Sequence, residues 1–137
     1  MSSEKVMMEF TIIGQETIGK ATLQREFAPR TVALIRFRLK NPIQSRVVVR
    51  EGEVAFPFKI GRVSPENAYK TLSRGDVAYW PQGTVLIVFL KQKTVSYPVN
   101  LVGRIDSGHM NFFDKLHIGT SIRIERIRPM INEVDYL

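Results

Sequence analysis

The segment 75–90, with the sequence GDVAYWPQGTVLIVFL, constrains the fold of this chain more than any other segment. Residues 85–90 are six apolar residues in a row. A run that short, rich in β-branched and aromatic types, is typical of a strand buried on both faces. Pro81 and Gly83 precede it with turn chemistry, because proline fixes φ and glycine accepts a positive φ. The pattern predicts the central hairpin of a mainly β core, with the only tryptophan, Trp80, at the edge of the turn.

The length and composition indicate an ordinary globular protein. The chain has 137 residues, the length of one domain, and a domain of that size builds one complete core. It has no cysteine, which excludes disulfides, thiol nucleophiles and thiolate metal sites. The first residues lack a long apolar run, and no segment approaches the roughly 18 apolar residues of a membrane span. We expect a single domain over residues 1–137, cytoplasmic and without membrane contact.

Basic residues are concentrated in one part of the sequence. The formal net charge is +7, and residues 25–50 hold seven basic residues and one acid, a net charge of +6. Such a local excess attracts phosphates or acidic partners. The alternative is a solvated helix face with an edge strand, because no basic-aromatic motif of nucleic-acid binding accompanies the charge. Both interpretations remain open at this point.

Periodicity and turn residues predict the remaining elements. Strands are expected at residues 6–13, 15–24, 46–50, 54–58, 100–105 and 121–127, and a short helix at 109–116. Residues 29–39 fit two patterns, because 35–40 alternate like a strand while Ala28, Val32, Ile35 and Leu39 form a helical stripe. Pro29 suits a first helical position, which favours the helix. Residues 61–74 and 91–98 are interpreted as loops, with one helical turn near 65–69, and residues 128–137 as a C-terminal tail.

These elements define an all-β, mainly antiparallel architecture. Antiparallel strands need closure or cover at their edges. The simplest solution is a closed barrel of about eight strands with two covering helices.

Three blocks of the sequence resemble the cyclophilins. Residues 13–39 are similar to the family's opening hairpin and first helix, with Pro29, Thr31 and Phe37 at matching places. Residues 101–124 are similar to a later strand, short helix and last strand, with Gly103 and Gly108 in register. Residues 75–90 occupy the place of the family's central hairpin. The resemblance implies a cyclophilin-like eight-stranded barrel.

The third block points to a narrower branch. Residues 75–83, GDVAYWPQG, look like an element of the small uncharacterised cyclophilin-like proteins of archaea and bacteria. Residues 50–56, REGEVAF, are also similar to a hairpin of that branch, with Glu51 where tryptophan is more usual.

The resemblance implies prolyl cis–trans isomerisation as the family's reaction. The barrier of about 18–20 kcal/mol comes from amide resonance, so catalysis needs an apolar proline pocket and a donor to the proline nitrogen. Arg50 is the stronger candidate for the guanidinium donor and Arg46 the weaker, although neither is followed by the family's usual segment. Ile87 stands where the family has a pocket phenylalanine, and Val99 stands near its groove histidine. The isomerase set is therefore eroded.

The ligand groove is expected to be bordered by aromatic and apolar side chains near Arg50. The candidates are Phe56, Phe58, Tyr79, Trp80, Ile87 and Tyr97. Phe56 and Phe58 fit pocket wall and core equally well, the pattern favours core for Ile87, and Trp80 covers either the barrel end or the groove. We expect no cofactor and no metal, because His109 and His117 lack the i, i+4 spacing of a zinc helix.

The sequence therefore favours a cyclophilin-like module that binds an extended peptide or small ligand. Two alternatives stand beside it. The first is an active peptidyl-prolyl isomerase, the one enzyme class that the resemblance supports. The second is a nucleic-acid or acidic-partner binder acting through residues 25–50. The sequence carries no signal of oligomeric state.

Overall fold

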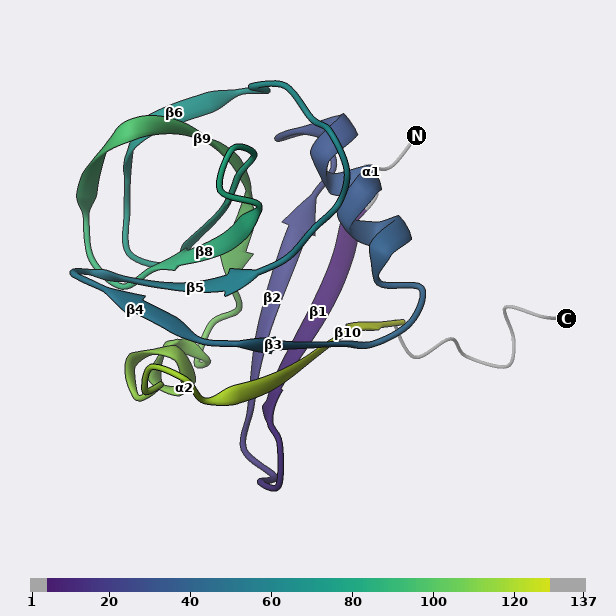
Figure 1. The fold of residues 1–137 in the computed structure, drawn as a ribbon, viewed down its shortest axis with the longest axis vertical. Helices are drawn as coiled ribbons and strands as arrows, with labels where there is room; N and C mark the ends of the chain where they lie inside the picture. Colours follow the sequence, from purple (N-terminus) through teal and green to yellow (C-terminus); the bar gives the residue numbers. More distant parts are fainter. Residues whose placement is uncertain (1–4, 129–137) are drawn as a thin grey trace, which may run out of the picture.

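The computed structural model describes residues 5–128, which form ten strands and two short helices (Figure 1). The elements in chain order are β1 (Lys5–Ile12), β2 (Ile18–Gln24), α1 (Pro29–Arg38), β3 (Ile43–Arg46), β4 (Val48–Arg50), β5 (Glu53–Pro57), β6 (Ala68–Leu72), β7 (Asp76–Trp80), β8 (Val85–Phe89), β9 (Lys93–Ile105), α2 (Met110–Asp114) and β10 (Ser121–Ile127). All ladders between them are antiparallel. The prediction of a mainly β protein with two helices is confirmed.

The central hairpin lies where the apolar run predicts it. β7 pairs with β8 from Trp80 opposite Val85 to Val77 opposite Val88. The side chains of residues 86–89 are all at most 1% exposed, so this strand is buried on both faces. β8 lies between β7 and β5 in the sheet, which explains why both of its faces are covered.

The predicted closed barrel is not found. The strands follow the order β3-β10-β1-β2-β9-β7-β8-β5-β4, with β6 paired to β9, and the end strands β3 and β4 do not pair with each other. The β4–β5 ladder stops at Val48 opposite Ala55, and two residues further along the same register Arg46 would stand opposite Pro57. Proline has no N–H to donate to a ladder. We attribute the open seam to Pro57, whose carbonyl instead accepts a 2.8 Å hydrogen bond from Ser45 Oγ.

The strand count exceeds the predicted eight for two reasons. The expected strand at 46–50 is divided at Val47, whose N–H donates to the Thr120 carbonyl instead of to a neighbouring strand. Residues 61–74, interpreted as a loop with a helical turn, contain β6, and residues 91–98 belong largely to β9. Both loop interpretations are wrong at these positions. Their polar residues face solvent while Leu72 and Val95 point inward, and so short a one-sided pattern reads like a loop.

Helix α1 forms where Pro29 and the apolar stripe place it. Val32, Ile35 and Leu39 are buried, and Arg36 and Arg38 occupy the last turn, where cations favour the helix dipole. The second helix is shorter than the expected 109–116, because the Lys115 N–H already closes back onto the Phe113 carbonyl.

The core is divided into two clusters on opposite faces of the sheet segment formed by β5, β8 and β7. The main core packs Phe10, Phe56 and Phe113 between the two helices, with ring centroids 5.1 to 6.4 Å apart. The second core contains Ala55, Leu72, Ala78, Ile87, Phe89, Val95 and Val99. β6 and the first half of β9 supply part of this second core, and so cover the outer face of the central strands.

Two further expectations concern membrane spans and the C-terminal tail. In the described residues, no helix has the length and apolar character that spanning a bilayer requires. The expected tail begins at Arg128, and its residues 129–137 lie outside the described part of the chain.

Candidate functional site

The predicted groove residues separate into two groups on opposite faces of the sheet. Phe56, Phe58 and Tyr79 lie in the main core, each at most 2% exposed. The Tyr79 hydroxyl donates a 2.7 Å hydrogen bond to the Phe58 carbonyl inside that core. None of the three lines either cavity described below, so their role in the structure is packing. The alternative reading of Phe56 and Phe58 as core is the one that the structure favours.

Four other candidates gather on the second-core face. Trp80 stacks on Tyr97 with ring centroids 4.0 Å apart and planes inclined by 21°. The Arg50 side chain lies close enough to the Tyr97 hydroxyl for its charge to act on that group. Burial raises the pKa of Tyr97 above its ordinary value of 10, and the nearby charge of Glu53 adds to this, while Arg50 lowers it. Arg50, Trp80 and Tyr97 therefore lie close together on this face.

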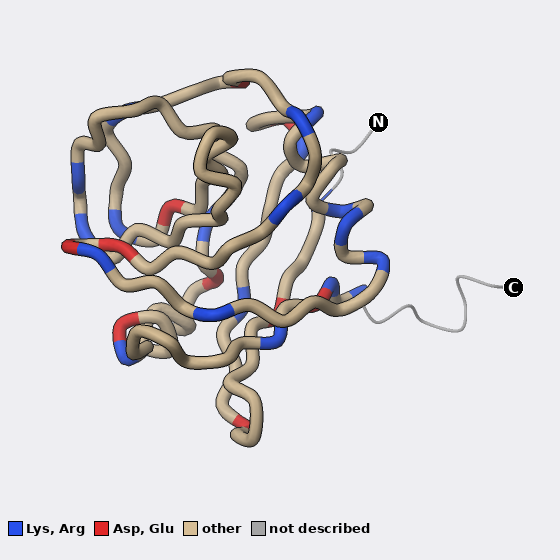
Figure 2. Tube along the Cα trace, in the orientation of Figure 1, with Lys and Arg blue, Asp and Glu red and all other residues tan. Residues whose placement is uncertain are grey.

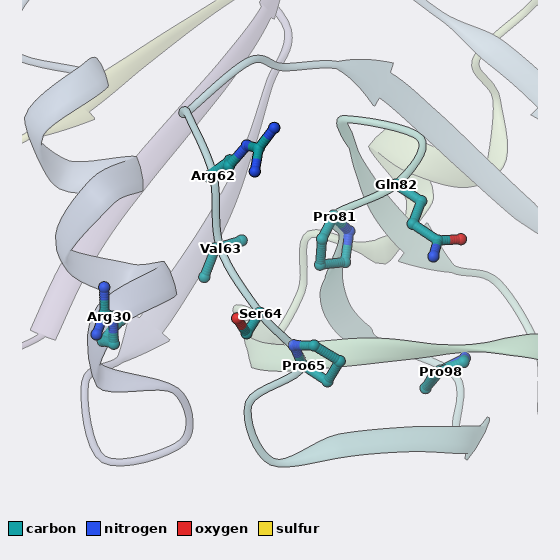
Figure 3. Close-up of a pocket in the computed structure, with 8 residues that line it drawn as sticks. All are labelled: Arg30, Arg62, Val63, Ser64, Pro65, Pro81, Gln82 and Pro98. Atoms are coloured by element: carbon teal, nitrogen blue, oxygen red, sulfur yellow. The ribbon is translucent and has the colours of Figure 1, made fainter.

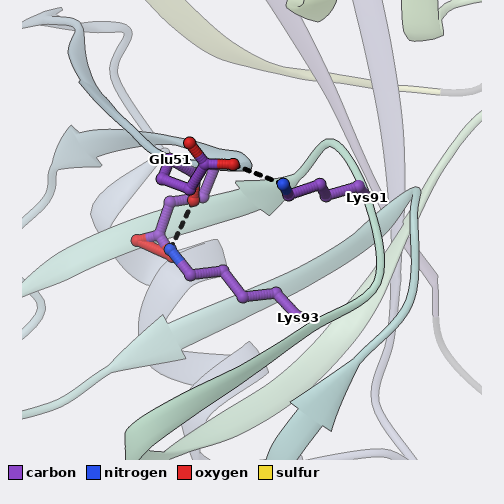
Figure 4. A network of polar contacts seen from close by, with 4 residues as sticks. Glu51, Lys91 and Lys93 are labelled. Atoms are coloured by element: carbon purple, nitrogen blue, oxygen red, sulfur yellow. Dashed lines mark hydrogen bonds and ion pairs between the residues drawn. The ribbon is translucent and has the colours of Figure 1, made fainter.

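A network of charges closes the end of the second core next to Arg50. Glu53, which is 1% exposed, forms a 3.1 Å ion pair with Lys93 Nζ. Lys93 also donates to the carbonyl of Glu51, whose carboxylate pairs with Lys91 (Figure 4). The bond to Lys91 lowers the pKa of Glu51. The carboxylates of Glu51 and Glu53 are therefore already paired with lysines, and neither is left to pair with Arg50.

The position of the expected proline pocket is filled. Ile87 is 1% exposed and Val99 is fully buried, and both belong to the second core. β9 covers this face because its register against β6 shifts between Tyr69 and Thr71, where a bulge in β9 includes Tyr97 and Pro98. Bulges redirect side chains in this way.

The structure contains a larger candidate site that the sequence did not predict. A cavity of about 470 Å³ opens between the start of α1, the segment after β5, the turn between β7 and β8, and β9 (Figure 3). Its lining residues are Arg30, Arg62, Val63, Ser64, Pro65, Pro81, Gln82 and Pro98. Two guanidinium groups and three proline rings therefore share one cavity. Neither guanidinium forms an ion pair with an acidic side chain of residues 5–128.

A partly buried hydrogen-bond network holds the cavity wall in place. Glu66 accepts hydrogen bonds of 2.9 Å from the N–H groups of Arg30 and Thr31, and so caps α1 from a distant loop. Asn100 is fully buried, accepts from the Glu66 N–H and donates to the Ser64 carbonyl. This network orients the loop that carries Arg62 against the helix that carries Arg30. Pro65 and the polar residues of 61–66 indicated a loop in the sequence, but nothing in the sequence indicated that this loop contacts the start of α1.

The cap on α1 makes stability depend on pH. Partial burial raises the pKa of Glu66, but the hydrogen bonds from Arg30 and Thr31 together outweigh it, and the pKa lies below its ordinary value of 4.5. A carboxyl group with a lowered pKa stabilises the fold at any pH above its ordinary pKa. This stabilisation is lost as the pH falls through the pKa of the folded state. We expect Glu66→Gln to lower the free energy of unfolding by about 1–2 kcal/mol at neutral pH, as for other lost caps. Denaturant titrations at pH 7 and pH 3 test this, and a difference that persists unchanged at pH 3 would contradict it.

Arg46 lines a second and separate cavity. This cavity of about 410 Å³ lies at the open seam between β3 and β5, and its other lining residues are Gln44, Ser45, Pro57 and Ser121. Arg46 and Arg50 therefore do not share a site. Among the described residues, no cluster of three or more His, Asp or Glu side chains is arranged to hold a metal ion.

Comparisons with known proteins agree with this architecture. The solution structure of a hypothetical protein from Archaeoglobus fulgidus matches with a TM-score of 0.73 at 25% identity, covering 92% of this chain and 98% of that chain. The structure of McbB in complex with tryptophan matches with a TM-score of 0.71 at 15% identity, covering 92% of this chain and 46% of the McbB chain, a likeness of fold alone. No curated protein matches. The cyclophilin-like family profile matches residues 8–125, and the chain belongs to the cyclophilin-like family.

Proposed function

We propose that this protein is a binding module for a small ligand or extended peptide that carries an acidic group, held in the cavity between Arg30 and Arg62. The single observation that carries the proposal is the composition of this cavity. Its volume of about 470 Å³ lies within the range of small-molecule sites. It combines apolar rings with a few charged donors, the usual composition of such sites.

The acidic group follows from the two arginines. A guanidinium presents several donors in a planar fork that matches a carboxylate or phosphate. The Arg30 side chain lies close enough to Glu66 for its charge to lower the carboxyl pKa, but that carboxylate is already used by backbone N–H groups. An external anion therefore supplies the missing acceptor for Arg30 and Arg62.

The rest of the ligand follows from the prolines. Pro65, Pro81 and Pro98 supply apolar surface that cannot donate hydrogen bonds through the backbone nitrogen. They lie on three separate segments, so a ligand that contacts all three is extended or carries a flat ring. Trp80 and Tyr97 immediately precede two of these prolines and keep them on a rigid base through their stacking.

The isomerase alternative has weaker support. Arg50 lies beside Tyr97, and the Ile87 side chain is buried in the second core beneath β6 and β9. A substrate proline at this face would have to displace strands of the protein itself. Acceleration of proline isomerisation in a peptide assay, lost in the Arg50→Ala variant, would favour this alternative.

A matched pair of probes tests the binding proposal. We expect N-acetylphenylalanine to shift the backbone amide signals of Val63, Ser64 and Gln82 in ¹H–¹⁵N spectra. The uncharged N-acetylphenylalaninamide should bind about tenfold more weakly, because hydrogen bonds to charged groups contribute about 1.5–3 kcal/mol. Arg62→Ala should weaken binding of the acid by a similar factor and leave the amide unaffected.

Arg46→Ala is the matched control, because it removes the same charge from the other cavity. Equal affinities for the acid and the amide, or shifts that follow Arg46 instead of Arg62, would contradict the proposal.

A further inference from the structure

The surface of α1 and the chain that follows it carries positive charge without any acid. Residues 27–50 contain six basic residues and no aspartate or glutamate. Figure 2 shows blue segments along α1 and onward to β3, and no red on this stretch of the chain itself. Arg38 and Lys40 are exposed and form no ion pair with a described acid. We call Phe37, Arg38 and Lys40 the α1 basic surface.

The rest of the fold treats its charges differently. Between residues 51 and 114, four acidic side chains each form an ion pair with a basic one: Glu51–Lys91, Glu53–Lys93, Asp76–Arg104 and Asp114–Arg74. The last of these is bidentate, with distances of 2.9 and 2.7 Å. Residues 27–50, by contrast, contain basic side chains and no acid, and a local excess of one sign attracts a polyanion.

An aromatic ring stands in the middle of this charge. Phe37 is 68% exposed, although phenylalanine is among the residues most often buried. Lys40 Nζ lies 5.0 Å from the centroid of its ring, within the range of a cation–π contact. The buried stripe of α1 points the other way, so Phe37 contributes nothing to the core.

We propose that the α1 basic surface binds single-stranded nucleic acid. Arg38 and Lys40 contact phosphates, and a base stacks on Phe37, where Lys40 now lies. Aromatic platforms within basic surfaces bind single strands in this manner and tolerate any base sequence. An acidic peptide satisfies the two cations but has no planar partner for the exposed ring, so the ring favours nucleic acid. This surface excludes Arg30 and Arg62, and the proposal is therefore independent of the ligand cavity.

Fluorescence anisotropy with a labelled oligouridylate of about twenty nucleotides tests the proposal, since a strand of that length spans one site. We expect the affinity to fall about sevenfold between about 50 and about 200 mM salt, as for two phosphates neutralised on a single strand. Arg38→Glu with Lys40→Glu should reduce the affinity at least tenfold and flatten the salt dependence. Lys70→Glu with Lys115→Glu, an equal change of charge at exposed lysines elsewhere, should have a much smaller effect.

Phe37→Ala separates stacking from charge. We expect it to weaken binding about fivefold or more with an unchanged salt dependence, and Phe37→Trp to restore the affinity. Circular dichroism confirms that each variant is folded.

Three outcomes would overturn the proposal. They are no binding of the oligouridylate at low salt, equal binding of polyglutamate, and equal losses in the two double variants. Polyglutamate binding that is lost with Arg38 and Lys40 but insensitive to Phe37 would instead identify an acidic-peptide surface.

Discussion

Replacing Phe56 by alanine is expected to lower the free energy of unfolding by about 3–5 kcal/mol, the usual effect of removing a buried aromatic ring. Phe56 is fully buried, and its ring lies 5.2 Å from that of Phe10 and 6.4 Å from that of Phe113. The change leaves a cavity where β5 meets both β1 and α2. Because the free energy of unfolding of a domain is only about 5–15 kcal/mol, this substitution removes a large part of it.

Urea denaturation followed by the fluorescence of Trp80 measures this effect. Phe37→Ala is the matched control, because the same side-chain atoms are removed from a ring that is 68% exposed. We expect the control to change stability by less than about 0.5 kcal/mol. A small effect at Phe56 together with a clear loss of ligand affinity would show that this residue serves the groove, as first expected, and not the core.

Replacing Gly103 by alanine is expected to lower the free energy of unfolding by at least about 3 kcal/mol, the upper end of the usual range for overpacking. A Cβ atom at this position would lie 2.2 Å from the Thr22 carbonyl oxygen and 2.7 Å from the Leu23 Cα. Both atoms belong to the backbone of β2, which pairs with β9 at this point. A strand backbone cannot move aside as a side chain does, so the ladder between β2 and β9 must open.

Gly14→Ala provides the comparison for Gly103. Gly14 has a φ of 91° in the turn between β1 and β2, and a Cβ there meets no atom within 4 Å. Only backbone strain is added, which costs about 1 kcal/mol. Thermal unfolding of both variants should therefore rank Gly103→Ala well below Gly14→Ala. Equal stabilities would mean that β2 and β9 are less closely packed than the structure shows.

The elements predicted well are those with a local cause. Helix α1 was identified from Pro29 and a stripe of apolar residues, and the central hairpin from Pro81, Gly83 and an apolar run. These signals act within a few residues, so the sequence carries them directly. The expected strand at 46–50 was broken for a distant reason, because Val47 bonds to the turn before β10 and Pro57 ends the ladder.

The candidate site was predicted only in part. Arg50, Trp80 and Tyr97 lie close together, but the larger cavity is formed by Arg30, Arg62 and three prolines that no motif links. Four separate segments meet there, and their meeting depends on Glu66 and Asn100. The sequence placed residues 61–66 in a loop, and a loop does not reveal which helix it contacts.

The exposed position of Phe37 shows the same limit. The sequence identifies it as a residue of the first helix at a place that matches the cyclophilins. Its exposure depends on which face of α1 turns toward the core, and that face is chosen by contacts with strands far along the chain.

By itself the sequence determined the family, the mainly β class, the first helix and the buried central strand, because each of these depends on residue preferences over short distances. The tertiary structure alone decided that the sheet stays open, that β6 and β9 cover the expected proline pocket, and that two arginines face a cavity. These features depend on the register between distant strands and on single groups such as the missing N–H of Pro57. The effect of such a group appears only when the fold brings another strand next to it.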